Sequence, residues 1–115
     1  MDFENNEKLK SLVTRLVKKA ASRDLAMTVE EAKDEIEEAL LEYYNDRHFT
    51  PTENNPYEDI YSGIIIQLAL SSYSKAGAEG ETSHMEGGIS RMYDNGSNYP
   101  LSLTRKIIPL AKGVD

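Results

Sequence analysis

Apolar residues recur at steps of three and four in two stretches near the start of the chain, which predicts two amphipathic helices. The first helix is expected over residues 7–21 and the second over residues 29–46. Thr28 and Glu31 stand at the spacing of a capping box and mark the beginning of the second helix. The apolar positions of the first stripe are Leu9, Leu12, Val13, Leu16, Val17 and Ala20, and those of the second are Ala32, Ile36, Ala39, Leu40 and Tyr43.

A third stretch is apolar on nearly every side of the helix it would form, which predicts a central helix covered by the other two. We expect this helix over residues 56–75, with Asn55 as its cap and Pro56 at its first position. Gly77 and Gly80 mark its end. A glycine-rich loop is expected over residues 77–100, and a C-terminal tail with one marginal helix over residues 101–115.

These elements predict an all-α fold in one domain over residues 1–115: a small three- to four-helix bundle with a long glycine-rich loop and a C-terminal tail. The chain of 115 residues has no cysteine, so disulfides and thiolate metal sites are excluded, which suits a reducing cytoplasm. Its longest apolar run, from Gly63 to Leu70, is far shorter than the ~20 residues of a bilayer span. The first residues lack the pattern of a signal peptide. We therefore expect a soluble protein with no membrane partner.

The net charge of −7 opposes loose binding to nucleic acid, but the charges are unevenly distributed. Basic residues concentrate between Lys8 and Arg23, and acidic residues between Glu30 and Glu42. Two solvated helix faces would explain this pattern. Alternatively, the basic and acidic elements attract each other, either within one chain or between copies of it.

The sequence offers little catalytic chemistry, since it contains no phosphate-binding loop, dinucleotide fingerprint, HExxH or GxSxG motif. Ser83, His84 and Glu86 resemble a nucleophile with its base, but adjacent residues rarely present their side chains to each other in that way. Glu79, Glu81, His84 and Glu86 carry donors suited to a divalent metal, without a fixed ligand spacing. We expect no catalytic residue, no cofactor and no metal site.

The segment from Glu79 to Pro100 is longer than most loops in so small a domain, and such loops are usually functional or disordered. Gly87 and Gly88 together permit a turn that other residues disfavour. Its apolar residues are spaced to bury against another surface, which favours contact with a neighbouring subunit. These residues are Met85, Ile89, Met92 and Tyr93.

The run from Ser74 to Tyr93, followed by Tyr99-Pro100 and a short apolar tail, resembles the head–tail connector (adaptor or head-completion) proteins of tailed bacteriophages and of prophages in Gram-positive bacteria. The resemblance is good from Pro56 to the C-terminus, and the first two helices match in length and pattern. The matching positions are Glu79, Gly80, Ser83, Glu86, Gly87, Ser90 and Tyr93.

The resemblance implies a structural, non-enzymatic protein of the virion, located at the head–tail junction and assembled in the bacterial cytoplasm. It implies a homo-oligomeric ring of about a dozen copies beneath the portal protein. Such a ring extends the DNA channel, lets DNA pass without specific binding, and joins the head to the next head-completion or tail protein. The alternative is a small helical DNA-binding regulatory protein that uses the basic first helix.

The expected subunit or portal interface combines the glycine-rich segment with part of the tail. The tail's apolar residues could be covered by the protein's own bundle or by a partner. The charges of Arg105 and Lys106 favour a partner with an acidic surface. The expected interface residues are Glu79, Gly80, Ser83, His84, Glu86, Gly87, Gly88, Ile89, Ser90, Arg91, Tyr93, Arg105, Lys106, Ile107 and Ile108.

Overall fold

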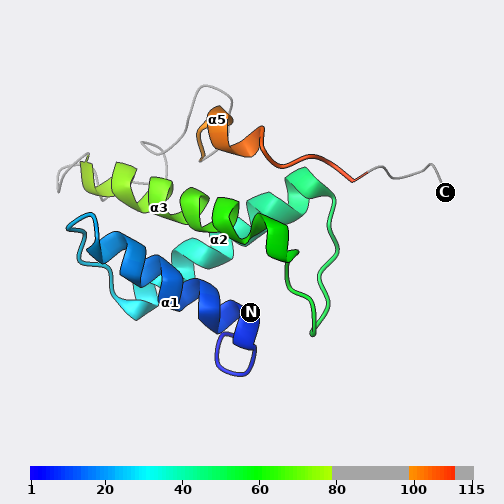
Figure 1. The fold of residues 1–115 in the computed structure, drawn as a ribbon, viewed down its shortest axis with the longest axis horizontal. Helices are drawn as coiled ribbons and strands as arrows, with labels where there is room; N and C mark the ends of the chain where they lie inside the picture. The colour runs from blue at the N-terminus through cyan, green and yellow to red at the C-terminus, as the bar shows by residue number, and fades with distance from the viewer. Residues whose placement is uncertain (79–98, 111–115) are drawn as a thin grey trace.

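The computed structural model describes residues 1–78 and 99–110, and all regular structure within these ranges is helical. The prediction of an all-α bundle is therefore confirmed. None of the helices in these ranges combines the length and the hydropathy that a membrane span requires. The elements in chain order are α1 (Glu7–Ala21), α2 (Val29–Arg47), the 3₁₀ helix η1 (Asp59–Tyr61), α3 (Ser62–Ala78) and the short α5 (Leu101–Thr104) (Figure 1).

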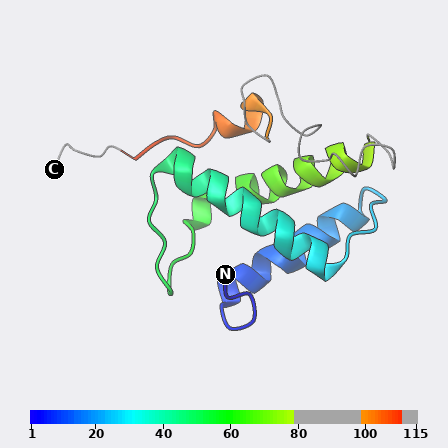
Figure 2. The same cartoon turned by 180° about the vertical axis from the view of Figure 1, so that it is seen from behind.

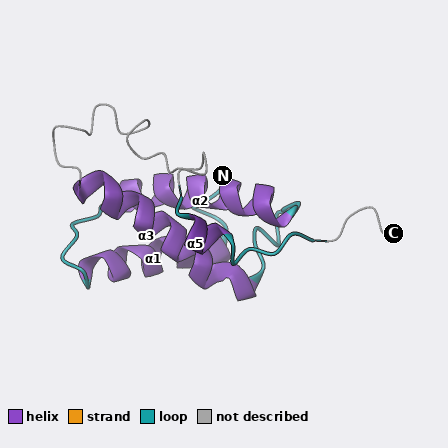
Figure 3. Cartoon of the chain, turned by 90° about the horizontal axis from the view of Figure 1, so that it is seen from above, coloured by secondary structure: helices purple, strands orange, loops and turns teal. Residues whose placement is uncertain are grey.

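Helix α3 is the centre of the bundle, because it packs against α1, α2, η1 and α5. The short helix α5 lies on the side of α3 away from α1 (Figures 1 and 2). Viewed from above, α5 crosses over α3, and the chain then continues towards the C-terminus (Figure 3). The largest fully buried side chains come from three helices and the segment after the undescribed residues: Leu12, Leu16, Ile36, Leu40, Tyr43, Ile65, Leu68, Leu70 and Tyr99.

Side-chain caps define the beginnings of the first two helices. The Asn6 side chain accepts hydrogen bonds from the backbone N–H groups of Lys8 and Leu9. At α2 the predicted capping box is present: Glu31 N donates to Thr28 Oγ1 at 3.1 Å, and Thr28 N donates to Glu31 Oε1 at 2.9 Å. The hydrogen bond from the Thr28 backbone holds the pKa of the Glu31 carboxyl below its ordinary value. Such a cap stabilises a helix by about 1 kcal/mol.

Helix α2 ends at a left-handed residue that is not a glycine. His48 has φ 61° and its N–H donates to the carbonyl oxygen of Tyr44. Histidine, asparagine and aspartate adopt this conformation more readily than other non-glycine residues. His48 is otherwise exposed, so its visible role is to terminate the helix.

The predicted beginning of the third helix at Pro56 is wrong, because η1 begins at Asp59 and α3 at Ser62. Polar side chains of the first two helices form hydrogen bonds with the backbone of residues 56–58. The hydroxyl of Tyr44 donates to Pro56 O at 2.7 Å, and Lys8 Nζ donates to Tyr57 O at 2.6 Å. Tertiary contacts thus hold this segment in a non-helical conformation, although Pro56 carries a good local signal for a helix start.

The central helix also differs from the prediction in its apolar face and in its end. Ile60, which belongs to the stretch expected to form the buried central helix, lies in η1 and is 80% exposed. Ile64 is only half-buried, whereas Ile65 is fully buried. The helix continues through Gly77 to Ala78, beyond the expected end at residue 75.

Candidate assembly surface

The structure describes one part of the predicted interface. The interface residues predicted between Glu79 and Tyr93 lie outside the described residues, and so do the side chains around His84 that resemble a nucleophile with its base or a set of metal donors. Arg105, Lys106, Ile107 and Ile108 lie in the described C-terminal segment, immediately after α5. Among residues 1–78 and 99–110, no three histidine, aspartate or glutamate side chains are grouped to hold a metal ion.

An ion pair at the end of α2 provides the anchor for this C-terminal segment. Arg47 Nε donates to Glu58 Oε1 at 2.8 Å and Arg47 Nη2 to Glu58 Oε2 at 3.0 Å, which is a two-pronged contact of the strong kind. The hydroxyl of Tyr43 donates to Glu58 Oε1 at 2.5 Å and accepts from Glu58 N at 3.0 Å. Both partners of the ion pair are largely buried.

The protonation of this cluster follows from its contacts. The hydrogen bonds from Arg47 hold the pKa of the Glu58 carboxyl below its ordinary value. Burial raises the pKa of Tyr43 above its ordinary value. Because the carboxyl pKa is lowered in the folded chain, its contribution to stability is present at neutral pH and is lost as the pH falls through the lowered pKa. Glu58 is thus ionised, and Arg47 is held in place, at neutral pH.

Arg47 also fastens the C-terminal segment to the bundle. Its Nη1 donates to the carbonyl oxygen of Ile108 at 2.6 Å, and its own carbonyl oxygen accepts from Leu110 N at 2.8 Å. The hydroxyl of Tyr61 accepts from Ile108 N at 3.2 Å. The guanidinium of Arg47 lies 4.9 Å from the centre of the Tyr61 ring, within the range of a cation–π contact. Backbone and side-chain contacts together fix the segment after α5.

Ile107 belongs to the core, which corrects its assignment to the interface. It is 4% exposed and packs in the same buried cluster as Tyr99, with Leu103 packed against that cluster. The expectation that the tail is covered by a partner therefore fails on its inner side, because the bundle itself covers these residues. Two isoleucines that are adjacent in sequence face opposite environments, since Ile108 is 64% exposed.

The outer side of the segment remains available to a partner. Arg105 and Lys106 are exposed, and neither forms an ion pair within the described ranges. Leu101, Ile108 and Leu110 are large exposed apolar residues on the same segment. We call the exposed residues Leu101, Arg105, Lys106, Ile108 and Leu110 the tail surface. It combines apolar area with positive charge, on a segment that the hydrogen bonds of Arg47 hold against the end of α2.

Sequence reasoning missed the anchor itself. Arg47 and Glu58 are separated by a loop, and no local pattern connects them. The one available signal was the i, i+4 spacing of Tyr43 and Arg47, which places both side chains on one face of α2.

Comparison with models of protein families matches residues 5–110 to the family described as phage gp6-like head-tail connector protein. The matched range contains all the described helices, the anchor and the tail surface. No curated protein and no solved structure matches the chain significantly.

Proposed function

The chain belongs to the phage gp6-like head-tail connector family, and from this premise we propose that it forms a closed ring of about a dozen copies beneath the portal protein. The ring extends the channel through which DNA leaves and enters the head. It also offers a docking platform for the next head-completion or tail protein. As a phage structural connector, the protein is a component of the virion.

The family match over nearly the whole chain is the observation that carries this proposal. The tail surface supports it, because apolar and basic side chains are exposed together on a segment that the bundle holds in place. Exposed apolar residues gathered on one segment are typical of a protein interaction site. A rigid segment loses little conformational entropy on binding, which favours a stable contact.

The work of the protein in this proposal is binding, with no covalent step. DNA passes through the ring without sequence-specific contacts, and the excess of acidic residues suits a channel that does not grip phosphate. Subunit contacts involve the segment from Glu79 to Tyr93, and the tail surface contacts the portal protein. The regulatory alternative gains no support from the family match.

Reversing the two charges of the tail surface is expected to weaken portal binding. In the double variant Arg105→Glu/Lys106→Glu, attraction to an acidic portal surface becomes repulsion, and we expect at least ~10-fold weaker binding. Both side chains are exposed, so the melting temperature is expected to stay within about 2 °C of the wild type. Affinity is measured by biolayer interferometry on the immobilised portal complex of the same phage.

The matched control is Arg105→Lys/Lys106→Arg, which keeps both charges and is expected to bind as the wild type does. If the charge-reversed variant bound the portal complex as tightly as the wild type does, the tail surface would not be part of the portal contact. Absence of portal binding by the wild type would count against the proposed function as a whole.

A further inference from the structure

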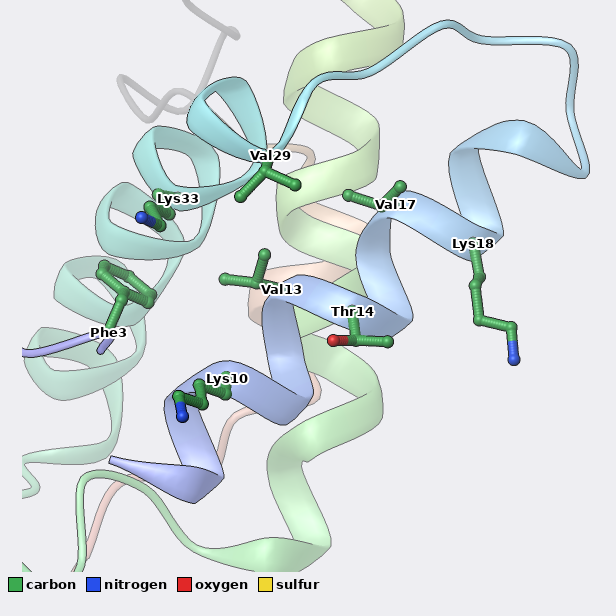
Figure 4. Close-up of a pocket in the computed structure, with 8 residues that line it drawn as sticks. All are labelled: Phe3, Lys10, Val13, Thr14, Val17, Lys18, Val29 and Lys33. Carbon is green, nitrogen blue, oxygen red and sulfur yellow. The ribbon is translucent and has the colours of Figure 1, made fainter. Parts of the chain in front are cut away.

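An apolar groove runs between α1 and the beginning of α2 (Figure 4). Its volume is about 390 Å³, and its apolar lining comes from Phe3, Val13, Val17 and Val29. The close-up shows the three valines drawn together where the two helices approach each other. Val29 is a large apolar residue that remains exposed in the isolated chain.

The rim of this groove is positively charged. Lys10 and Lys18 line it from α1, and Lys33 lines it from α2. No acidic side chain among the described residues lines it. Lys18 forms no ion pair in the described part of the chain, and the pairs of Lys10 and Lys33 join neighbouring exposed residues on the same helix. Such pairs contribute little and leave the lysines available to a partner. The groove therefore fits an apolar side chain surrounded by carboxylates.

The outer face of α2 has the opposite character. Leu41 is 57% exposed and stands three, four and seven residues after Glu38, Glu37 and Asp34. At 100° per residue these four side chains share the side of the helix that faces away from the buried Ile36. The three carboxylates are exposed and form no ion pair within residues 1–78 and 99–110. We call Asp34, Glu37, Glu38 and Leu41 the acidic ridge.

The ridge and the groove cannot meet within one chain. Val29 and Lys33 bring the groove to one side of α2, whereas the ridge lies on its outer side. The two surfaces are nevertheless complementary in charge and in apolar character. Because one chain cannot bring them together, only contact between two copies of the chain places the ridge against the groove.

We propose that the acidic ridge of one subunit docks in the lysine-rimmed groove of the next, with Leu41 seated against the valines. This inference rests on the proposed ring and adds a second subunit contact to the one proposed for the segment from Glu79 to Tyr93. The two surfaces differ, so the contact is heterologous, and repeated heterologous contacts that close produce a ring. Each subunit uses its groove on one side and its ridge on the other.

A charge exchange tests the pairing. The groove variant is Lys10→Glu/Lys18→Glu and the ridge variant is Asp34→Lys/Glu38→Lys, and all four side chains are exposed. Each variant alone places like charges across every contact, so we expect self-association to require at least ~10-fold higher concentration. In a 1:1 mixture the two variants can alternate around the ring. Each contact between them joins opposite charges, because a reversed groove meets a reversed ridge and a native groove meets a native ridge. The mixture is expected to assemble at a concentration within about threefold of that required by the wild type.

Assembly is measured by sedimentation velocity across a concentration series, with and without the portal complex of the same phage, and circular dichroism shows whether each variant is folded. Folded variants that assemble as the wild type does, or a mixture no better than either variant alone, would overturn the pairing while leaving the proposed ring intact. A wild-type chain that stays monomeric in both conditions would overturn the ring and the pairing together. A variant that is misfolded is replaced by the single change at Lys18 or Glu38, and the same mixing outcomes apply.

Discussion

Replacing Ile65 by aspartate is expected to unfold the protein at room temperature. Ile65 is fully buried in α3, the helix that contacts every other element of the described bundle. An unpaired carboxylate at this position costs several kcal/mol, in addition to the lost apolar burial. Domains of this size are stable by about 5–15 kcal/mol, so the change removes most or all of that margin. Far-ultraviolet circular dichroism at 25 °C should show a large loss of helical signal.

Gln67→Asp provides the matched control for this experiment. Gln67 lies two residues further along the same helix and is exposed, so the same aspartate is solvated there. Its melting temperature is expected to stay close to that of the wild type, since surface substitutions usually change stability by less than about 0.5 kcal/mol. If Ile65→Asp melted as the control does, α3 would not be the centre of the fold.

The second large effect is expected at Ile107, where alanine should destabilise the domain by about 2–4 kcal/mol through loss of buried apolar volume. For a domain of this size that corresponds to a fall of roughly 8–16 °C in Tm. The structural reason is that Ile107 is buried in the core, under a segment fastened by Arg47. Differential scanning calorimetry measures the difference directly.

The adjacent substitution Ile108→Ala distinguishes the exposed side of the tail from its buried side. Ile108 is largely exposed, so its replacement is expected to leave Tm nearly unchanged and to lower portal binding instead. The two variants remove the same atoms at neighbouring positions and differ only in what those atoms contact. Equal Tm values for both variants would mean that the bundle does not cover the tail, and that the segment orders only on a partner.

The elements that follow from local rules were predictable from the sequence. Periodic apolar residues define α1 and α2, and Thr28 with Glu31 forms the expected capping box. The all-α fold was predictable for the same reason, because each apolar stripe must be buried against another helix. The structure confirms this fold. The family match also confirms the resemblance to phage head–tail connectors that the segment after Ser74 suggested.

The predictions that were wrong concern features that depend on contacts between residues far apart in the sequence. A sequence cannot indicate that Tyr44 will donate a hydrogen bond to the carbonyl group of Pro56, and Lys8 to that of Tyr57. These hydrogen bonds keep the third helix from beginning at Pro56. Nor can a sequence indicate which of two adjacent isoleucines will face inward, because the C-terminal segment has no regular period. The ion pair of Arg47 and Glu58 links both regions, since it holds the segment before α3 and the tail to the same end of α2.

Locating the protein in purified virions tests the central claim most directly. Gold-labelled antibodies against this chain, viewed by electron microscopy on virions of the phage that encodes it, are expected to mark the junction between head and tail. Virions with the tail detached should keep the label at the vertex of the head that carries the portal. Label distributed over the head surface or along the tail, or its absence from virions that contain the portal protein, would contradict the assignment as a head–tail connector.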